Sequence, residues 1–210
     1  MTDDGRASTH NELSGSASGP VLQAHSVRNV HFHGPKSSQA PLVPFQIPPA
    51  PQTFAGRQPE LAALSGWLDD GRGRIIVLSG TAGVGKTALA LHWLPQLREN
   101  FADGLLFVDL GRSTSPPVTP TDVLEWFLLA LNVSAQDIPL EESPRQAMYR
   151  SVTARRSLVV LLDDAISAAQ VRPLFPLGDN SITVVTSRFR LSGLAMDGAQ
   201  FTAALSPRGD

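Results

Sequence analysis

The 210-residue chain contains no cysteine, which excludes disulfide bonds and thiolate metal sites and is typical of a reducing cytoplasm. It has no apolar run of the roughly 20 residues that a membrane-spanning helix needs, and its polar N-terminus lacks the apolar core of a signal peptide. The formal net charge is only −2, so electrostatics gives no reason to expect nucleic acid as a partner. We therefore expect a cytoplasmic protein without membrane contact and without direct nucleic acid contact.

Lysine is almost absent, since only Lys36 and Lys86 stand against fifteen arginines. A genome rich in G and C, which favours arginine codons, accounts for this bias. A lysine at position 86 then fits a chemical need, because a planar guanidinium cannot copy a compact ammonium on a flexible stem.

The sequence around Lys86 fits the phosphate-binding loop pattern G-x-x-x-x-G-K-[ST] at every fixed position. Residues 74–79 before it read as a short buried strand, and residues 88–93 after it read as the opening of a helix. Backbone N–H groups that converge in such a loop, together with the helix dipole, favour phosphate groups. We expect nucleotide contacts from the following residues: Gly80, Thr81, Ala82, Gly83, Val84, Gly85, Lys86, Thr87 and Ala88.

Within this loop, Lys86 is expected to reach the β- and γ-phosphates as a catalytic cation, and the Thr87 hydroxyl to ligate Mg²⁺. Residues 158–162 form an apolar run that ends in Asp163 and Asp164, which is a Walker B pattern. Asp163 is expected to hold Mg²⁺ through a water, because Mg²⁺ keeps much of its hydration shell. Asp164 is the candidate to polarise the attacking water. An ordinary strand followed by a solvated acidic turn is the alternative.

A further predicted strand, residues 181–186, is followed by Ser187 and Arg188. A cation at that strand tip would contact the γ-phosphate and report its presence, so Arg188 is the third catalytic candidate. The alternative is a surface arginine that merely ends a strand.

Other polar and aromatic residues carry weaker signals. His31 and His33 would share one face of a strand, but no third metal ligand is evident, so surface histidines are the favoured interpretation. The rings of Trp67, Trp93 and Trp126 are interpreted as core or helix-packing residues.

Composition divides the chain near Phe54. Residues 1–19 are small and polar and are expected to be disordered, and residues 21–33 hold two short β-prone stretches. Residues 34–53 contain six prolines, which predicts a linker that lies along the folded domain or leads into it. We expect a leader over residues 1–53 and a nucleotide-binding domain over residues 54–210.

Strand and helix signals alternate along that domain. Further strands are expected at 104–110 and 200–205, and helices at 59–68, 121–131, 144–155 and 165–174. Pro95 is expected to kink or stop the helix after the phosphate loop at about two turns. The pattern predicts an α/β fold, a three-layer P-loop NTPase sandwich with a five-stranded, mostly parallel sheet.

The motifs FAGRQPELAAL, GTAGVGKTALA, GLLFVDLGR, LVVLLDDA and ITVVTSRFRL, in this order, resemble the NB-ARC nucleotide-binding domain. This domain belongs to the STAND class of signalling P-loop ATPases, and the resemblance is closest to the actinobacterial branch of antibiotic-pathway regulators and NLR-like proteins. It covers residues 54–205. It implies that the backbone of Phe54, Gly56 and Arg57 lies along an adenine ring, and that residues 186–188 form the sensor motif.

After the fifth strand the family normally continues with a helical lid, a winged helix and a repeat array, whereas this sequence stops at Asp210. We expect a nucleotide-binding core truncated at that point, which binds nucleotide without full switching.

The resemblance implies an ATP- or ADP-binding regulatory switch with slow Mg²⁺-dependent hydrolysis, in a signalling or transcription-regulating ATPase. A protein partner or a homo-oligomer through the domain or the leader is expected. One alternative is a small-molecule P-loop kinase, which would need a lid with several arginines, whereas only Arg172 precedes the sensor motif. The other is an interaction module whose leader recruits a partner and whose core is inactive.

Overall fold

The computed structural model describes residues 42–71, 74–111, 118–202 and 205. Contacts divide the chain into two units, Met1–Ala40 and Pro41–Asp210. All described residues belong to the second unit. The β-prone stretch predicted at residues 21–33, with its two histidines, lies outside them.

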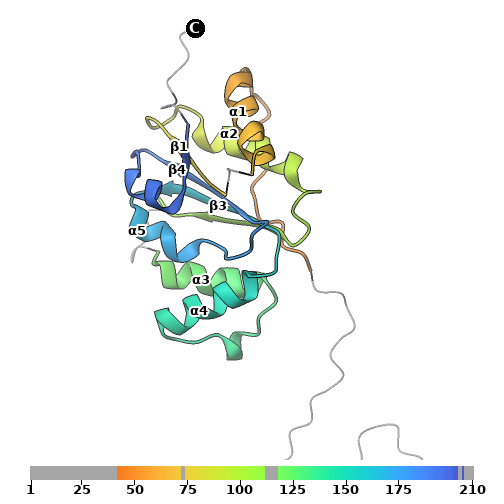
Figure 1. The fold of residues 1–210 in the computed structure, drawn as a ribbon, viewed down its shortest axis with the longest axis vertical. Helices are drawn as coiled ribbons and strands as arrows, with labels where there is room; N and C mark the ends of the chain where they lie inside the picture. Colours follow the sequence, from red (N-terminus) through yellow and green to blue (C-terminus); the bar gives the residue numbers. More distant parts are fainter. Residues whose placement is uncertain (1–41, 72–73, 112–117, 203–204, 206–210) are drawn as a thin grey trace, which may run out of the picture. The chain divides into compact units, whose positions relative to one another are not determined.

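Strands and helices alternate through this unit (Figure 1). The strands are β1 (Ile75–Ser79), β2 (Gly104–Asp109), β3 (Leu158–Ala165), β4 (Ile182–Ser187) and β5 (Gln200–Phe201). The α-helices are α1 (Gln58–Asp69), α2 (Lys86–Trp93), α3 (Pro120–Ala130), α4 (Glu142–Thr153) and α5 (Ala168–Val171). Four 3-10 turns complete the described elements: η1 (Leu94–Leu97), η2 (Ala135–Asp137), η3 (Arg172–Leu174) and η4 (Ser192–Asp197).

The sheet has five strands in the order β2-β3-β4-β1-β5, and every neighbouring pair is parallel. The predicted fold class is therefore confirmed. Parallel strands bring their carboxyl ends to one edge of the sheet. The loop after β1, the acids near the end of β3 and the polar residues that end β4 consequently meet at that edge.

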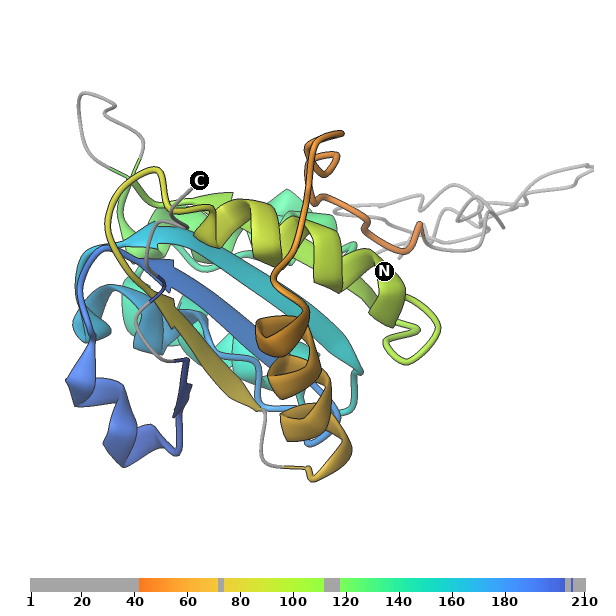
Figure 2. The same ribbon diagram turned by 90° about the horizontal axis from the view of Figure 1, so that it is seen from above.

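Helices cover both faces of the sheet, with α1 and α2 on one side and α3, α4 and α5 on the other (Figures 1 and 2). Side chains along each strand alternate between these layers. On β1, Val77 belongs to the core that includes residues of α3 and α4, whereas Ile76 and Leu78 belong to the core that includes residues of α1 and α2. Burial on both faces explains the continuous apolar runs in β1 and β3.

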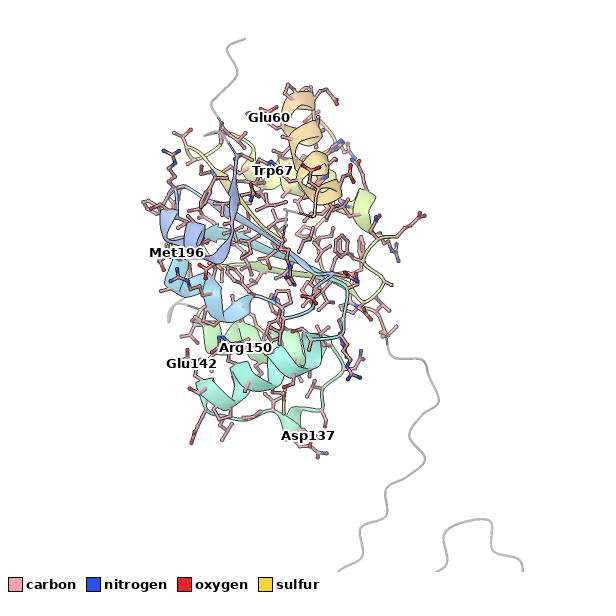
Figure 3. All side chains as sticks on the ribbon, viewed as in Figure 1. Glu60, Trp67, Asp137, Glu142, Arg150 and Met196 are labelled. Atoms are coloured by element: carbon pink, nitrogen blue, oxygen red, sulfur yellow. The ribbon has the colours of Figure 1, made fainter. Side chains whose placement is uncertain are left out.

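The predicted buried face of the helix at 121–131 is confirmed, since Val123, Leu124, Phe127, Leu128 and Leu131 are all buried. Among the tryptophans, Trp93 is buried, and its indole N–H donates to the Ser65 hydroxyl at 3.3 Å, which ties α2 to α1. Trp67, labelled on α1 in Figure 3, packs against the same core. The core interpretation is wrong for Trp126, which is 48% exposed because it lies on the outer face of α3.

The largest differences from the predicted boundaries lie at the ends of β3 and β5. β3 runs on to Ala165 through an irregularity at its acidic end, so α5 begins only at Ala168. β5 comprises only Gln200–Phe201, and Leu205 instead forms a separate bridge with Gly80. Pro95 acts as predicted, because α2 ends at Trp93 and the chain continues as the 3-10 turn η1.

Part of the proline-rich stretch pairs with the outer edge of the sheet. The Leu105 N–H donates to the Pro44 carbonyl and the Gln46 N–H donates to the Leu105 carbonyl, both at 2.9 Å. The Arg98 guanidinium lies 4.7 Å from the centre of the Phe45 ring, and Ile47 is buried. Residues 44–47, called here the edge segment, thus extend the packed region to the N-terminal side of Phe54.

Candidate nucleotide-binding site

The phosphate loop connects β1 to α2 at the carboxyl edge of the sheet. Gly83 and Gly85 have φ values of 77° and 91°, which side-chain-bearing residues adopt only with strain. Gly85 is also the N-cap of α2, so no side chain at the cap position competes for the N–H groups of the first turn. These N–H groups and the positive end of the helix dipole suit an anion.

Lys86, the first residue of α2, is 7% exposed. Its ammonium donates to the carbonyls of Gly80 at 3.0 Å and Thr81 at 2.8 Å. Burial lowers the pKa of this ammonium, while the nearby carboxylates of Asp164 and Asp163 act in the opposite direction. A phosphate beside it would likewise favour the charged form.

The Thr87 hydroxyl donates to Asp163 Oδ1 at 2.7 Å, which joins the phosphate loop to the end of β3. The same oxygen accepts a hydrogen bond of 2.5 Å from the Thr186 hydroxyl on β4. Hydroxyl and carboxylate oxygens are the ligands that Mg²⁺ prefers in proteins. No group of three or more His, Cys, Asp or Glu in the described part of the chain could hold a metal ion. The Thr87 hydroxyl and the Asp163 carboxylate are oxygen ligands that fit a magnesium ion, whose other ligands would be phosphate oxygens and water.

Asp164 has a φ of 49°, and its carboxylate turns to a different partner. Asp164 Oδ1 lies 3.2 Å from Arg188 Nε, and Oδ2 accepts from Arg188 Nη2 at 3.4 Å. This ion pair is partly exposed, so its own contribution to stability is small. It holds the cation of the β4 tip against the candidate base.

The phosphate loop borders two cavities that share Ala82 and Gly83. One, of about 350 Å³, is lined by Ala82, Gly83, Lys86, Thr87, Asp109, Gly111, Asp163, Asp164, Thr186 and Arg188. The other, of about 460 Å³, is lined by Thr53, Phe54, Ala55, Arg57, Ala82, Gly83, Val84, Gly85 and Ala88. The first carries the charged groups suited to phosphates and a metal, and the second has the more apolar lining suited to a nucleoside.

On the second cavity, Arg57 links α1 to the phosphate loop. Its Nη2 donates to the Val84 carbonyl and its Nη1 pairs with Glu60 Oε1, both at 2.9 Å. Glu60 is labelled on α1 in Figure 3. The Phe54 ring stacks on His92 of α2, with ring centres 4.2 Å apart. These contacts fix the wall of the cavity to both helices.

The structure thus brings the predicted site residues together. The catalytic and metal candidates Lys86, Thr87, Asp163, Asp164 and Arg188 all line the first cavity. Most of the other expected nucleotide-binding residues line the second, namely Phe54, Arg57, Ala82, Gly83, Val84, Gly85 and Ala88. The other three are absent from both linings: Gly56 precedes Arg57 in the chain, and Gly80 and Thr81 contact Lys86 through their carbonyls.

Sequence reasoning missed three residues of the first cavity. Asp109 ends β2 in register with Asp163, and its Oδ1 accepts from the Gly111 N–H at 3.0 Å. Thr186 enters the sequence prediction only as the start of the sensor motif, and Asp109 and Gly111 only as members of the motif GLLFVDLGR. Their shared signal is position, because each lies at or just after the carboxyl end of a strand.

Comparison with known proteins agrees with this geometry. Residues 69–170 match the family described as AAA domain. The chain is 40% identical over 168 residues to regulatory protein AfsR of Streptomyces coelicolor, which covers 76% of this chain and 17% of AfsR. It is also 40% identical over 157 residues to AfsR of Streptomyces griseus, covering 73% of this chain and 16% of that protein. The chain therefore spans about a sixth of the length of these relatives.

Among solved structures, the chain resembles the ORC2 protein of Aeropyrum pernix, determined in ADPNP and ADP complexes. The TM-score is 0.51 at 17% identity, over 74% of this chain and 49% of the other. At that identity the likeness concerns the fold alone. The chain thus contains a P-loop ATPase-like domain with relatives among regulatory proteins. Within the described ranges, none of the helices has the length and apolar character needed to cross a bilayer.

Proposed function

We propose that this chain is an ATP- or ADP-binding regulatory switch domain with slow Mg²⁺-dependent hydrolysis. The observation that carries the proposal is the hydrogen bond between Thr87 and Asp163, beside Lys86 and within one cavity. A loop residue, a strand-end acid and a loop lysine in this arrangement supply the metal contacts and the phosphate charge that a nucleoside triphosphate requires.

Lys86 would exchange its carbonyl partners for phosphate oxygens. The carbonyls of Gly80 and Thr81 accept hydrogen bonds from this ammonium and keep it at the loop. A phosphate offers negatively charged acceptors, which bind an ammonium more strongly than neutral carbonyls do. Thr87 and Asp163 would hold the magnesium ion, which neutralises charge on the phosphates when bound.

Asp164 and Arg188 would divide the remaining chemistry. Asp164 lines the same cavity and would orient and polarise the attacking water, while Arg188 would contact the γ-phosphate. Arg188 pairs with Asp164, so the sensing cation and the candidate base are in direct contact.

The regulatory part of the proposal rests on the similarity to the regulatory protein AfsR. The sequence motifs add the NB-ARC and STAND assignment, in which nucleotide state controls packing against neighbouring domains. A switch requires ATP and ADP to favour different conformations. We propose a protein partner or a second copy as the recipient of that change, and the cytoplasm as its compartment.

The kinase alternative receives no support from Arg172. Its Nε donates to Asp197 at 2.9 Å and its Nη2 donates to the Gly193 carbonyl at 2.6 Å. This arginine is therefore held against η4 and is not part of the lining of the phosphate-side cavity.

Isothermal titration with ATP and ADP, with Mg²⁺ and with chelator, tests the proposal. Lys86→Ala is expected to weaken triphosphate binding by about 10- to 100-fold, because it removes a charge-assisted contact worth about 1.5–3 kcal/mol. Arg74→Ala is the matched control. Arg74 directly precedes the amino end of β1, away from the phosphate loop, and pairs with Asp179. Equal binding by wild type and Lys86→Ala would refute the assignment.

A further inference from the structure

Asp163 and Asp164, near the end of β3, are adjacent in sequence but contact different residues. Asp163 accepts from Thr87, whereas Asp164 pairs with Arg188. β3 pairs regularly with β4 as far as Leu162 opposite Val185, and the next pair is Ala165 opposite Ser187. β3 thus contains one residue more than β4 in this interval, which is a β-bulge at Asp163 and Asp164. Without the bulge, successive side chains would simply alternate between the faces of the sheet.

Thr186 is the β4 residue that faces this bulge, and it is 1% exposed. Its hydroxyl oxygen accepts the Asp164 backbone N–H at 2.9 Å. The same hydroxyl donates its proton to Asp163 Oδ1 at 2.5 Å. A hydroxyl has one proton, so the direction of this chain of hydrogen bonds is fixed, from the Asp164 amide through Thr186 to the Asp163 carboxylate.

We propose that Thr186 is a positioning residue for the paired acids. Its hydroxyl holds the bulge so that Asp163 contacts Thr87, the other proposed magnesium ligand. Asp164, the proposed base, then contacts Arg188. Two hydroxyl protons converge on Asp163 Oδ1, which leaves Oδ2 for magnesium or one of its waters. The inference rests on the proposed function and assigns the residue that sets the geometry of that site.

Gly111 provides the space for the second acid. A Cβ at this position would lie 2.2 Å from Asp164 Oδ2, and the nearest atoms to it all belong to Asp164. Gly111 is not among the glycines with positive φ, so the requirement for glycine here is one of room rather than of backbone conformation. Thr186 therefore acts on both acids, and Gly111 acts on Asp164 alone.

The test uses magnesium dependence rather than turnover. Binding of a slowly hydrolysed ATP analogue is measured against Mg²⁺ concentration, and also in chelator, for the wild type, Thr186→Val and Thr186→Ser. Thr186→Val is nearly isosteric but lacks the hydroxyl, whereas Thr186→Ser keeps it. Thr183→Val is the matched control, with the same change in a buried residue near the other end of β4.

Thr186→Val is expected to raise the Mg²⁺ concentration for half-maximal binding by about tenfold or more, the range seen when partners of metal ligands are removed. Binding in chelator should stay as in the wild type, and Thr186→Ser and Thr183→Val should keep the wild-type midpoint. Gly111→Ala should keep this midpoint while phosphate release falls. Thermal unfolding checks that Thr186→Val is folded. If it is not, Thr186→Ala, which also lacks the hydroxyl and has a smaller side chain, replaces it.

Each other outcome overturns the inference. A wild-type midpoint in Thr186→Val, a shifted midpoint in Thr186→Ser, or equal losses with Mg²⁺ and chelator would each exclude a positioning role. A shifted midpoint in Gly111→Ala would contradict the division between the two acids. If the wild type itself binds no nucleotide, the proposed function fails first, and the two failures are distinguishable.

Discussion

The guanidinium of Arg57 donates to the carbonyl of Val84 at 2.9 Å and joins the start of α1 to the phosphate loop. The same side chain pairs with Glu60 through its other terminal nitrogen. Arg57 also has a φ of 64°, a conformation that is uncommon outside glycine. Nucleoside-side and phosphate-side parts of the site are therefore mechanically connected through one arginine.

Arg57→Lys is expected to lower the affinity for ATP and ADP alike. A lysine cannot bond two divergent partners with the geometry of a planar fork, so the link to Val84 or to Glu60 is lost. Loss of one such hydrogen bond costs about 1 kcal/mol, which corresponds to about fivefold in affinity. Isothermal titration measures it, with the exposed Arg190→Lys as control. Unchanged affinities would show that the link does not support the loop.

Asp164→Asn is expected to separate binding from hydrolysis. The amide keeps the shape of the carboxylate but cannot accept a proton from water, so phosphate release should fall by at least about 100-fold. Triphosphate affinity should hold or rise, because an uncharged amide no longer competes with phosphate for the guanidinium of Arg188. Phosphate release and titration are run side by side. Full turnover in this variant would remove Asp164 from the mechanism.

The amino end of α3 carries a capping box whose contribution depends on pH. The Thr119 hydroxyl and backbone N–H both donate to Asp122 Oδ2, at 2.7 and 2.9 Å, and these bonds lower the pKa of that carboxyl below its ordinary 3.8. A carboxyl with a lowered pKa in the folded state stabilises the fold above pH 3.8, and this stabilisation is lost as pH falls below that value.

Asp122→Ala should therefore lower the free energy of unfolding by about 0.3–1 kcal/mol at neutral pH, the usual contribution of an acidic side chain in the first turn of a helix. The difference from the wild type should shrink as pH falls below 3.8. Urea unfolding at several pH values measures it. Asp137→Ala, at the exposed residue labelled in Figure 3, is the control and should show little change. A pH-independent difference would contradict the assignment.

Gly104→Ala is expected to loosen the edge segment. Gly104 has a φ of 121°, and a Cβ there would lie 2.6 Å from the Pro44 carbonyl oxygen. Overpacking of this kind costs about 1–3 kcal/mol. Urea unfolding should show this loss, whereas Gly66→Ala in α1, where a Cβ meets open space, should stabilise the protein by up to about 1 kcal/mol. Equal stability of the two variants would mean that the edge segment contributes nothing to the fold.

The sequence predicted the strands, the helices and the convergence of the site because these depend on local patterns. Apolar runs, a glycine-rich loop and strand-end acids are all visible without tertiary contacts. The parallel order then brings Lys86, Asp163 and Arg188 to one edge, and the structure places all three around one cavity.

What the sequence did not predict depends on contacts between distant residues. The bulge at the end of β3 needs a positive φ at Asp164, and nothing local to that residue requires it. The Thr186 hydroxyl, on β4, accepts the backbone N–H of Asp164 in this bulge. Gly111, which approaches the Asp164 carboxylate closely, follows the end of β2. Residue type alone predicts a core or helix-packing role for Trp126, whereas its position on the outer face of α3 leaves it 48% exposed.

The two outer strands of the sheet leave little room for growth by strand addition. The edge segment already uses both backbone hydrogen-bonding groups of Leu105 on the outer side of β2. The opposite edge is formed by β5, which has only two residues. Short or covered edges prevent the sheet-to-sheet joining that leads to aggregation. We therefore expect any assembly of this domain to use helix and loop surfaces rather than strand addition.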